Sequence, residues 1–293
     1  MAGTRTADEA RRWVAPGVLY LVATPIGNLS DLSARAAQVL AEVDLVVAED
    51  TRVTGRLLKH LDVAVPLLSW HAHSGPDRLA DIVRRLEEGA AVAVVSDAGL
   101  PAVSDPGREL VEAAWAHQLP VSPIPGPSAG VAAFAASGFD LPWVQWGFLP
   151  ARGAERQEQL ARVLVAPGAQ VLYEAPHRVR ALLDALVAAG AGERTVVWVR
   201  ELTKIHEQWF RGTVADAAAA MAAGPPPRGE WTVVLGPPPA KTAAPLDWDA
   251  AVLAVDRLVA TGIPGSEACR QVAAHGALSR RELYRRWHAQ GSD

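Results

Sequence analysis

Two Ser-Asp-x-Gly units stand close together in residues 96–107, SDAGLPAVSDPG, and this stretch has the composition of a ligand-binding loop. Gly99 can adopt backbone conformations that other residues resist, and Pro101 stiffens the chain beside it. The apolar residues 90–95 come directly before, and they predict a strand that is buried on both faces. Open α/β sheets bind ligands at the carboxyl ends of their strands, although an ordinary tight turn would have the same composition.

The end of this loop also predicts how the next helix begins. Asp105 followed by Pro106 is typical of an N-cap with proline at the first helical position. We therefore expect a helix over residues 108–118 that Asp105 caps.

Loops of the same kind follow other predicted strands, at residues 24–29 (TPIGNL), 49–52 (EDTR) and 125–130 (PGPSAG). Asp50 could cap the helix that follows it or lie with Arg52 at the edge of a shared crevice. Ser128 leaves the same two alternatives open. If the strands are parallel, all these loops meet at one edge of the sheet.

His71 and His73 are two residues apart in a predicted extended segment, so their side chains could share a face and chelate a metal ion. No cluster of cysteines or carboxylates accompanies them. The sequence therefore favours a polar patch over a metal site, and we predict no bound metal.

Composition describes a packed globular protein. Half of the 293 residues are hydrophobic, the net charge is −4, and Cys269 is the only cysteine. One cysteine excludes an internal disulfide and suits a reducing compartment, and the charge excludes nucleic-acid binding driven by the overall field. Residues 119–139 carry no charge, but their four prolines argue against a membrane span. With no secretory signal visible, we expect a cytoplasmic protein.

The order of apolar segments predicts an α/β protein with five parts. A polar tail covers residues 1–16, and five strand–helix units with a mostly parallel sheet cover residues 17–142. The alternation restarts over residues 143–236. A proline-rich linker at 237–247 then leads to three short helices over 248–293.

The loops resemble, in order and spacing, those of the ribosomal RNA small subunit methyltransferase I family within the tetrapyrrole methylase superfamily. The resemblance covers about residues 17–236, and more loosely the C-terminal helices. It is carried by TPIGNL at 24–29, AEDTR at 48–52, SDAG at 96–99, SDPG at 104–107, PGPS at 125–128, GFLP at 147–150, YE at 173–174, HR at 177–178 and RELTK at 200–204.

The resemblance implies a two-domain tetrapyrrole-methylase-like fold with a small helical C-terminal appendage, usually in a homodimer. It implies S-adenosyl-L-methionine as cofactor and 2'-O-methylation of a decoding-centre cytidine of 16S rRNA in the small ribosomal subunit. The cofactor-binding residues that it implies are Pro25, Gly27, Asp97, Gly99, Pro101, Val103, Ser128, Phe148, Tyr173 and Glu230.

Methyl transfer to a ribose hydroxyl needs alignment of the reacting atoms and gains from a general base. The candidate bases are Asp50, Glu174 and Glu201, and the candidate contacts to phosphate or ribose are Arg52, Arg178 and Lys204. A structural ion pair is the alternative for each of these six residues.

Two other functions stay open at this point. A methylase of small tetrapyrrole-type molecules would share the cofactor loops but would have less reason for the C-terminal helices. A non-catalytic ribosome-binding factor on the same scaffold would not need intact loops.

The last predicted helix is amphipathic. Arg281 and Arg285 share one face, while Leu283 and Trp287 share another. Ser279 and Glu282 have the spacing of a capping box. We expect the arginine face to contact ribosomal RNA and the apolar face to pack onto the body of the protein, with a solvated arginine face on a small packed bundle as the alternative.

Overall fold

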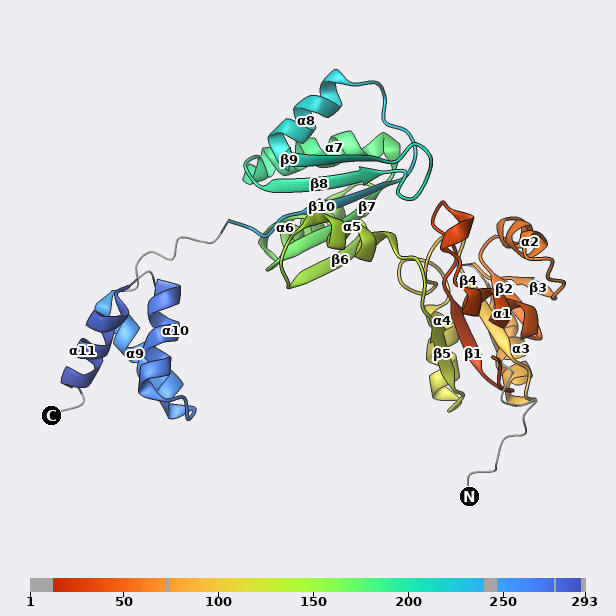
Figure 1. Cartoon of the computed structure of the whole chain (residues 1–293), viewed down its shortest axis with the longest axis horizontal. Helices are drawn as coiled ribbons and strands as arrows, with labels where there is room; N and C mark the ends of the chain where they lie inside the picture. The colour runs from red at the N-terminus through yellow and green to blue at the C-terminus, as the bar shows by residue number, and fades with distance from the viewer. Residues whose placement is uncertain (1–12, 72–73, 240–246, 277, 291–293) are drawn as a thin grey trace. The chain divides into compact units, whose positions relative to one another are not determined.

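The computed structural model describes residues 13–71, 74–239, 247–276 and 278–290 (Figure 1). The chain forms two compact units, Met1–Pro237 and Pro238–Asp293. Each unit is described by itself below.

The first sheet of the larger unit has five strands, and every pairing in it is parallel. The strands lie in the order β3-β2-β4-β1-β5. They are β1 (Leu19–Val22), β2 (Leu45–Ala48), β3 (Leu67–Ser69), β4 (Val92–Val95) and β5 (Val121–Ile124). The predicted parallel sheet in the first half of the chain is confirmed.

Helices cover both faces of this sheet. On one face α1 (Ala34–Glu42) and α2 (Thr51–His60) bury apolar side chains against β1, β2 and β4. On the other face α3 (Pro76–Glu87) and α4 (Arg108–Ala116) do the same. Burial on both faces explains why the central strands β1, β2 and β4 are continuous apolar runs in the sequence.

The start of α4 differs from the prediction. Gly107, with φ of +127°, stands at the N-cap position, and the helix begins at Arg108 without a side-chain cap. Asp105 is not the cap because its side chain bonds Ser96 instead and lines the cavity described below.

The second sheet is mixed. Its strands are β6 (Trp143–Phe148), β7 (Ala169–Glu174), β8 (Thr195–Arg200), β9 (Gln208–Thr213) and β10 (Trp231–Leu235), in the order β6-β7-β10-β8-β9. The β6–β7 pair is parallel, and the other three pairings are antiparallel.

This sheet is covered by helices from both halves of the larger unit. On one face pack α6 (Ala154–Val165), α7 (Pro176–Leu186) and α8 (Val214–Ala223). On the opposite face lies α5 (Ala129–Ser137), which follows β5 of the first sheet yet contacts β7, β8 and β10 (Figure 1). Helix α5 therefore joins the first sheet to the second.

Residues 119–139 form β5, a loop and α5, as their prolines suggested. Within the ranges that the structure describes, no helix is long and apolar enough to cross a membrane.

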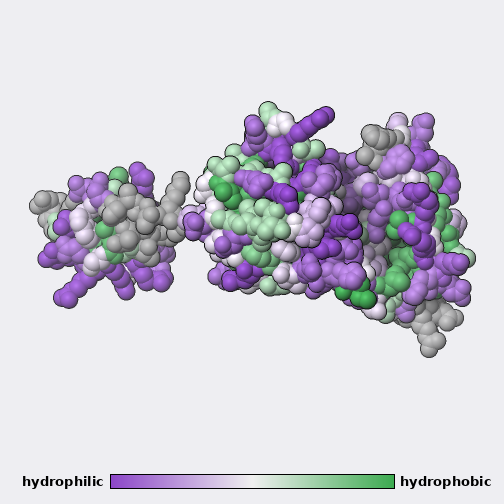
Figure 2. Space-filling model, turned by 90° about the horizontal axis from the view of Figure 1, so that it is seen from above, coloured by the Kyte–Doolittle hydropathy of each residue, from purple (hydrophilic) through white to green (hydrophobic). Residues whose placement is uncertain are grey.

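The smaller unit consists of α9 (Trp248–Ala260), α10 (Gly265–Gly276) and α11 (Arg280–Gln290). Leu283 is fully buried, and Trp287 packs beside it against α9 and α10. The apolar face of α11 is thus covered inside this unit, and the prediction that it packs onto the body of the protein is wrong. The visible surface of the unit is mostly hydrophilic (Figure 2).

The predicted capping box at the start of α11 is only half formed. Ser279 Oγ accepts a hydrogen bond from the Glu282 N–H at 3.4 Å. The Glu282 carboxylate instead accepts from Arg285 and Arg286, because both guanidinium groups lie within reach on the next turn.

Candidate functional site

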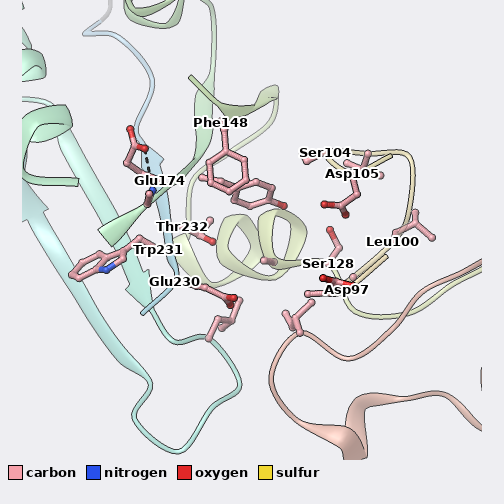
Figure 3. Close-up of a pocket in the computed structure, with 18 of the residues that line it drawn as sticks. Asp97, Leu100, Ser104, Asp105, Ser128, Phe148, Glu174, Glu230, Trp231 and Thr232 are labelled. Atoms are coloured by element: carbon pink, nitrogen blue, oxygen red, sulfur yellow. Dashed lines mark hydrogen bonds between the residues drawn. The ribbon is translucent and has the colours of Figure 1, made fainter. Parts of the chain in front are cut away.

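A cavity of about 410 Å³ lies where the loops of the first sheet meet the carboxyl ends of β6 and β7 and the start of β10. Figure 3 shows its two sides, with Asp97, Leu100 and Asp105 opposite Phe148, Thr232 and Glu230. Ser128, at the start of α5, lies on the same side as Asp97 and Asp105. Cavities of this size are typical of small-ligand sites.

The first-sheet side of the cavity is stiffened by hydrogen bonds between loops. Thr24 and Gly99 exchange two backbone hydrogen bonds of 2.9 and 3.1 Å, and Thr24 Oγ1 donates to the Ser96 carbonyl at 3.0 Å. Gly99 has φ of +90°, and a methyl group placed on it would lie 3.4 Å from Ile26 Cγ2. Only glycine takes this conformation without strain.

Tyr173 connects the two sides of the cavity. Its hydroxyl accepts a hydrogen bond from the Gly130 N–H at 3.0 Å and lies 3.3 Å from Gln145 Nε2. A methyl group on Gly130 would lie 2.5 Å from Gln145 Oε1 and 3.0 Å from the Tyr173 hydroxyl, so glycine gives α5 room to approach the second sheet closely. Burial raises the pKa of Tyr173, and the phenol therefore stays protonated at neutral pH.

Seven of the ten predicted cofactor-binding residues line this cavity. They are Asp97, Gly99, Val103, Ser128, Phe148, Tyr173 and Glu230. Ser128 makes no side-chain cap bond to α5, and its hydroxyl bonds the side chain of Tyr173 at the cavity instead. Pro25, Gly27 and Pro101 belong to the adjoining loops and are not lining residues.

Gly27 has a different environment. A methyl group on it would lie 2.5 Å from Lys204 Cγ and 2.8 Å from Thr203 Oγ1. The loop after β1 therefore packs directly under the loop after β8. Lys204 Nζ in turn contacts Glu201 at 2.9 Å and Glu230 at 3.0 Å. Glu201 also accepts a hydrogen bond from the Glu230 N–H, so this candidate base lies in an ion-paired cluster.

Asp50 is both the N-cap of α2 and the partner of Arg52. Its Oδ1 accepts from the Arg52 N–H, and its Oδ2 lies 2.7 Å from Arg52 Nη2. The hydrogen bond from the Arg52 side chain lowers the pKa of Asp50 to about 2. The backbone N–H of Asp50 donates to Asp97 Oδ1, which ties α2 to the cavity wall.

Glu174 is almost completely buried beside the cavity, between two arginines. Arg178 Nε lies 2.7 Å from its Oε1, and Arg156 Nη2 lies 3.1 Å from its Oε2. The Ala175 N–H also donates to Oε1 (Figure 3). Arg156 Nη1 also donates a hydrogen bond to the Pro150 carbonyl at 2.9 Å, so the cluster of Glu174 and its two arginines holds the loop that follows β6.

Glu49 and Asp105 also line the cavity, and sequence reasoning missed both. Burial raises the pKa of each, and the neighbouring carboxylate of Asp97 raises it further. Neither has an ion pair within the described ranges. The position of Glu49, one residue beyond β2, was the available signal, but Asp50 beside it drew the prediction.

No metal centre was predicted, and no group of three or more potential metal ligands occurs among the residues that the structure describes. His71 lies at the end of β3, whereas His73 lies outside the described residues.

The lining combines carboxylates with apolar side chains and contains no lysine or arginine among the residues placed by the structure. Ile26, Leu202 and Trp231 supply apolar surface. Such a cavity suits a ligand with a positive charge and a flat apolar group, because carboxylates favour cations and apolar walls favour rings.

Comparison with known proteins agrees with this geometry. The tetrapyrrole (corrin/porphyrin) methylases match residues 18–218. The ribosomal RNA small subunit methyltransferase I of a Synechocystis strain is 41% identical over 92% of this chain and 96% of its own. That of Streptococcus pyogenes serotype M1 is 38% identical over 93% and 95%.

A solved structure shares the fold of the larger part of the chain. It is a uroporphyrin-III C-methyltransferase from Thermus thermophilus in complex with S-adenosylhomocysteine, with a TM-score of 0.52 and 17% identity over 74% of this chain and 96% of that one. The chain thus belongs to the tetrapyrrole methylase family and, within it, to the ribosomal RNA small subunit methyltransferase I family.

Proposed function

We propose that this protein is an S-adenosyl-L-methionine-dependent methyltransferase that methylates the 2'-oxygen of a decoding-centre cytidine in 16S rRNA of the small ribosomal subunit. The observation that carries the proposal is the match to ribosomal RNA small subunit methyltransferases I over more than nine tenths of both chains. A methylase of small tetrapyrroles is disfavoured because the solved tetrapyrrole methylase cited above matches only 74% of the chain.

The cavity fits the cofactor in charge and shape. S-adenosylmethionine supplies an activated methyl group on a positively charged sulfur. Glu49, Asp97 and Asp105 place negative charge around the cavity, while Ile26 and Trp231 offer apolar surface to a flat ring. Gly99 lets the backbone of the loop after β4 approach the ligand closely.

The contribution of the protein to the reaction is mainly alignment. Hydrogen bonds between Thr24 and Gly99, and between Gly130 and Tyr173, hold both walls rigid before a ligand enters. Holding the two reacting groups in line can lower a barrier by about 7–11 kcal/mol.

A carboxylate at the cavity can accept the proton of the ribose hydroxyl. Asp50, Glu174 and Glu201 all have cationic partners, which hold their charge in place. Glu49 and Asp105 line the cavity with raised pKa values, so their carboxylates are better proton acceptors. We therefore add these two residues to the candidate general bases.

Among the predicted RNA contacts, Arg52 is the most available, since its side chain is 89% exposed and lies beside the cavity wall. All three cations have carboxylate partners, but the side chains of Arg178 and Lys204 are only 21% and 29% exposed. We also propose that the protein is cytoplasmic and forms a homodimer. Light scattering of the purified protein tests the homodimer.

Two assays test the proposal in sequence. Calorimetry is expected to find one S-adenosylmethionine site per chain, and labelled methyl groups are expected to appear on small ribosomal subunits. Because the net charge is −4, a short naked RNA fragment is expected to be a poorer substrate than the shaped site on a subunit. Cofactor binding without methyl transfer would favour a non-catalytic ribosome-binding factor, and equal rates on both substrates would contradict the proposed mode of recognition.

Removing residues 240–293 tests the role of the C-terminal helices. Helix α11 carries four arginines against one glutamate, and Arg281 and Arg285 are exposed. We expect the truncated protein to bind S-adenosylmethionine normally but to methylate subunits more slowly at low salt. The difference in rate between the full-length and the truncated protein should narrow as salt rises. Each phosphate contact that the truncation removes makes the slope of log affinity against log salt shallower by about 0.7–0.9. Full activity of a folded truncated protein at every salt concentration would exclude these helices from substrate binding.

A further inference from the structure

Phe148 lines the cavity, yet 55% of its surface is exposed. The family resemblance implied that this residue belongs to the cofactor pocket. A cofactor pocket buries most of its ligand and of its own apolar lining, whereas more than half of the Phe148 surface is open to solvent. An exposed aromatic ring that lines a site offers contact surface to a second ligand.

An irregularity in β6 presents the ring. The pairing of β6 with β7 shifts register between Gln145 and Gly147, and Gly147 has φ of +66°. Bulges of this kind turn the following side chain to a new direction and recur beside active sites. A methyl group on Gly147 would lie 3.2 Å from Ser104 Oγ, so the loop after β4 passes close to the end of β6.

The ring also has a rigid support. Tyr173 is the register partner of Phe148 on β7, and the two ring centroids are 5.5 Å apart at an interplanar angle of 55°. The hydroxyl of Tyr173 is held by the Gly130 N–H. Phe148 therefore rests on a ring that cannot easily move, which favours a contact of defined geometry.

A second exposed apolar side chain lies on the neighbouring loop. Val103 lines the same cavity and is 54% exposed, one residue before Ser104. Phe148 and Val103 thus provide apolar surface from the two sides that Ser104 and Gly147 bring together. A flat ring with apolar faces is the chemical group that such surfaces bind.

We propose that Phe148, with Val103 beside it, is the platform on which the base of the target nucleotide packs, while the ribose enters the cavity. This inference rests on the proposed function. A nucleotide that presents its ribose to an enclosed site must leave its stack, and unstacked bases commonly pack on aromatic side chains. Phe148 is then a substrate-positioning residue and not part of the cofactor pocket.

The substitution Phe148→Leu keeps an apolar side chain and removes the aromatic face. We expect the affinity for S-adenosylmethionine, measured by calorimetry, to stay within about twofold, and kcat/KM for small subunits to fall about 5- to 150-fold, the range of base stacking. Phe148→Tyr should restore kcat/KM because it keeps the ring. Trp209→Leu is the matched control, since Trp209 is 40% exposed on β9 and is not among the cavity-lining residues.

Two results would overturn the inference. A loss of cofactor affinity in Phe148→Leu as large as the loss in kcat/KM would return the ring to the cofactor pocket, and an unchanged kcat/KM would remove it from the substrate site. Filter binding of the same variants to small subunits needs no methyl transfer. A wild-type chain that binds subunits without methylating them would therefore contradict the proposed function, while weaker binding by Phe148→Leu alone would still support the platform. Equal binding of small subunits by the wild-type protein and by Phe148→Leu would be a third result against the inference, because it would exclude the platform.

Discussion

Replacing Gly99 with valine is expected to reduce S-adenosylmethionine affinity by more than about 100-fold, because the new side chain occupies the space between three loops at the cavity. A Cβ at this position already contacts Ile26 Cγ2 at 3.4 Å and the Pro127 carbonyl oxygen at 3.5 Å. The two γ-methyl groups of valine must then extend into the cavity or push these loops apart. Calorimetry on the purified variant measures the effect.

The control for this prediction separates backbone strain from cavity filling. Gly190 has φ of +83°, close to the +90° of Gly99, but a Cβ there would meet nothing within 4 Å. Gly190→Val should therefore lose stability of the order of 1–2 kcal/mol, as expected for a left-handed valine, and keep its cofactor affinity. Normal affinity in a folded Gly99→Val protein would show that the cofactor does not bind against this loop.

Replacing Glu174 with alanine is expected to cost about 3–5 kcal/mol of unfolding free energy, since it leaves the charges of Arg156 and Arg178 without their shared partner. Their side chains are only 14% and 21% exposed, so water cannot replace the carboxylate well. The expected fall in Tm is roughly 6–20 °C for a unit of this size. Thermal and denaturant unfolding measure both quantities.

Glu88→Ala is the matched control for Glu174. It removes the same type of carboxylate from an exposed pair, in which Glu88 Oε1 lies 2.6 Å from Arg84 Nη1. Exposed pairs contribute about 0.2–1 kcal/mol. Equal losses in the two variants would show that the buried group does not support the fold. Glu174→Gln keeps an acceptor oxygen for one arginine and places an amide NH2 group against the other, so its loss of stability should fall between those of Glu174→Ala and Glu88→Ala.

The first sheet could be predicted because its strands and helices have clear patterns in the local sequence. The central strands β1, β2 and β4 are short apolar runs buried on both faces, and each is followed by a loop and a helix. The second sheet was harder to predict, since its strand order depends on contacts between segments that are distant in the sequence. Its final strand, β10, inserts between β7 and β8, and nothing in the sequence of residues 231–235 states which neighbours it takes.

The candidate site could also be predicted only in part. The glycine and proline loops were visible in the sequence, and seven of the ten predicted cofactor residues do line one cavity. The partners of the charged residues were not visible, because they are set by packing. Arg156 lies 18 positions before Glu174, and Glu230 lies 26 positions after Lys204.

Predictions from local sequence patterns also failed at the candidate site. Asp105 has the spacing of a helix cap, but its side chain bonds Ser96 and lines the cavity instead. Glu49 is the first residue of the EDTR loop, but the prediction selected Asp50 beside it, whereas the end of β2 places Glu49 at the cavity. Both exceptions are carboxylates at the candidate site, where function and local preference compete.

The most direct test of the central claim is to map the methyl group on its product. Small ribosomal subunits lacking the modification are incubated with the protein and labelled S-adenosylmethionine, and the rRNA is digested to nucleosides and to sequence-specific fragments for mass spectrometry. The proposed function predicts one added methyl group on the ribose of a single cytidine in the decoding centre of 16S rRNA. A methyl group on a base or on a ribosomal protein, or no transfer by a protein that binds the cofactor, would contradict it.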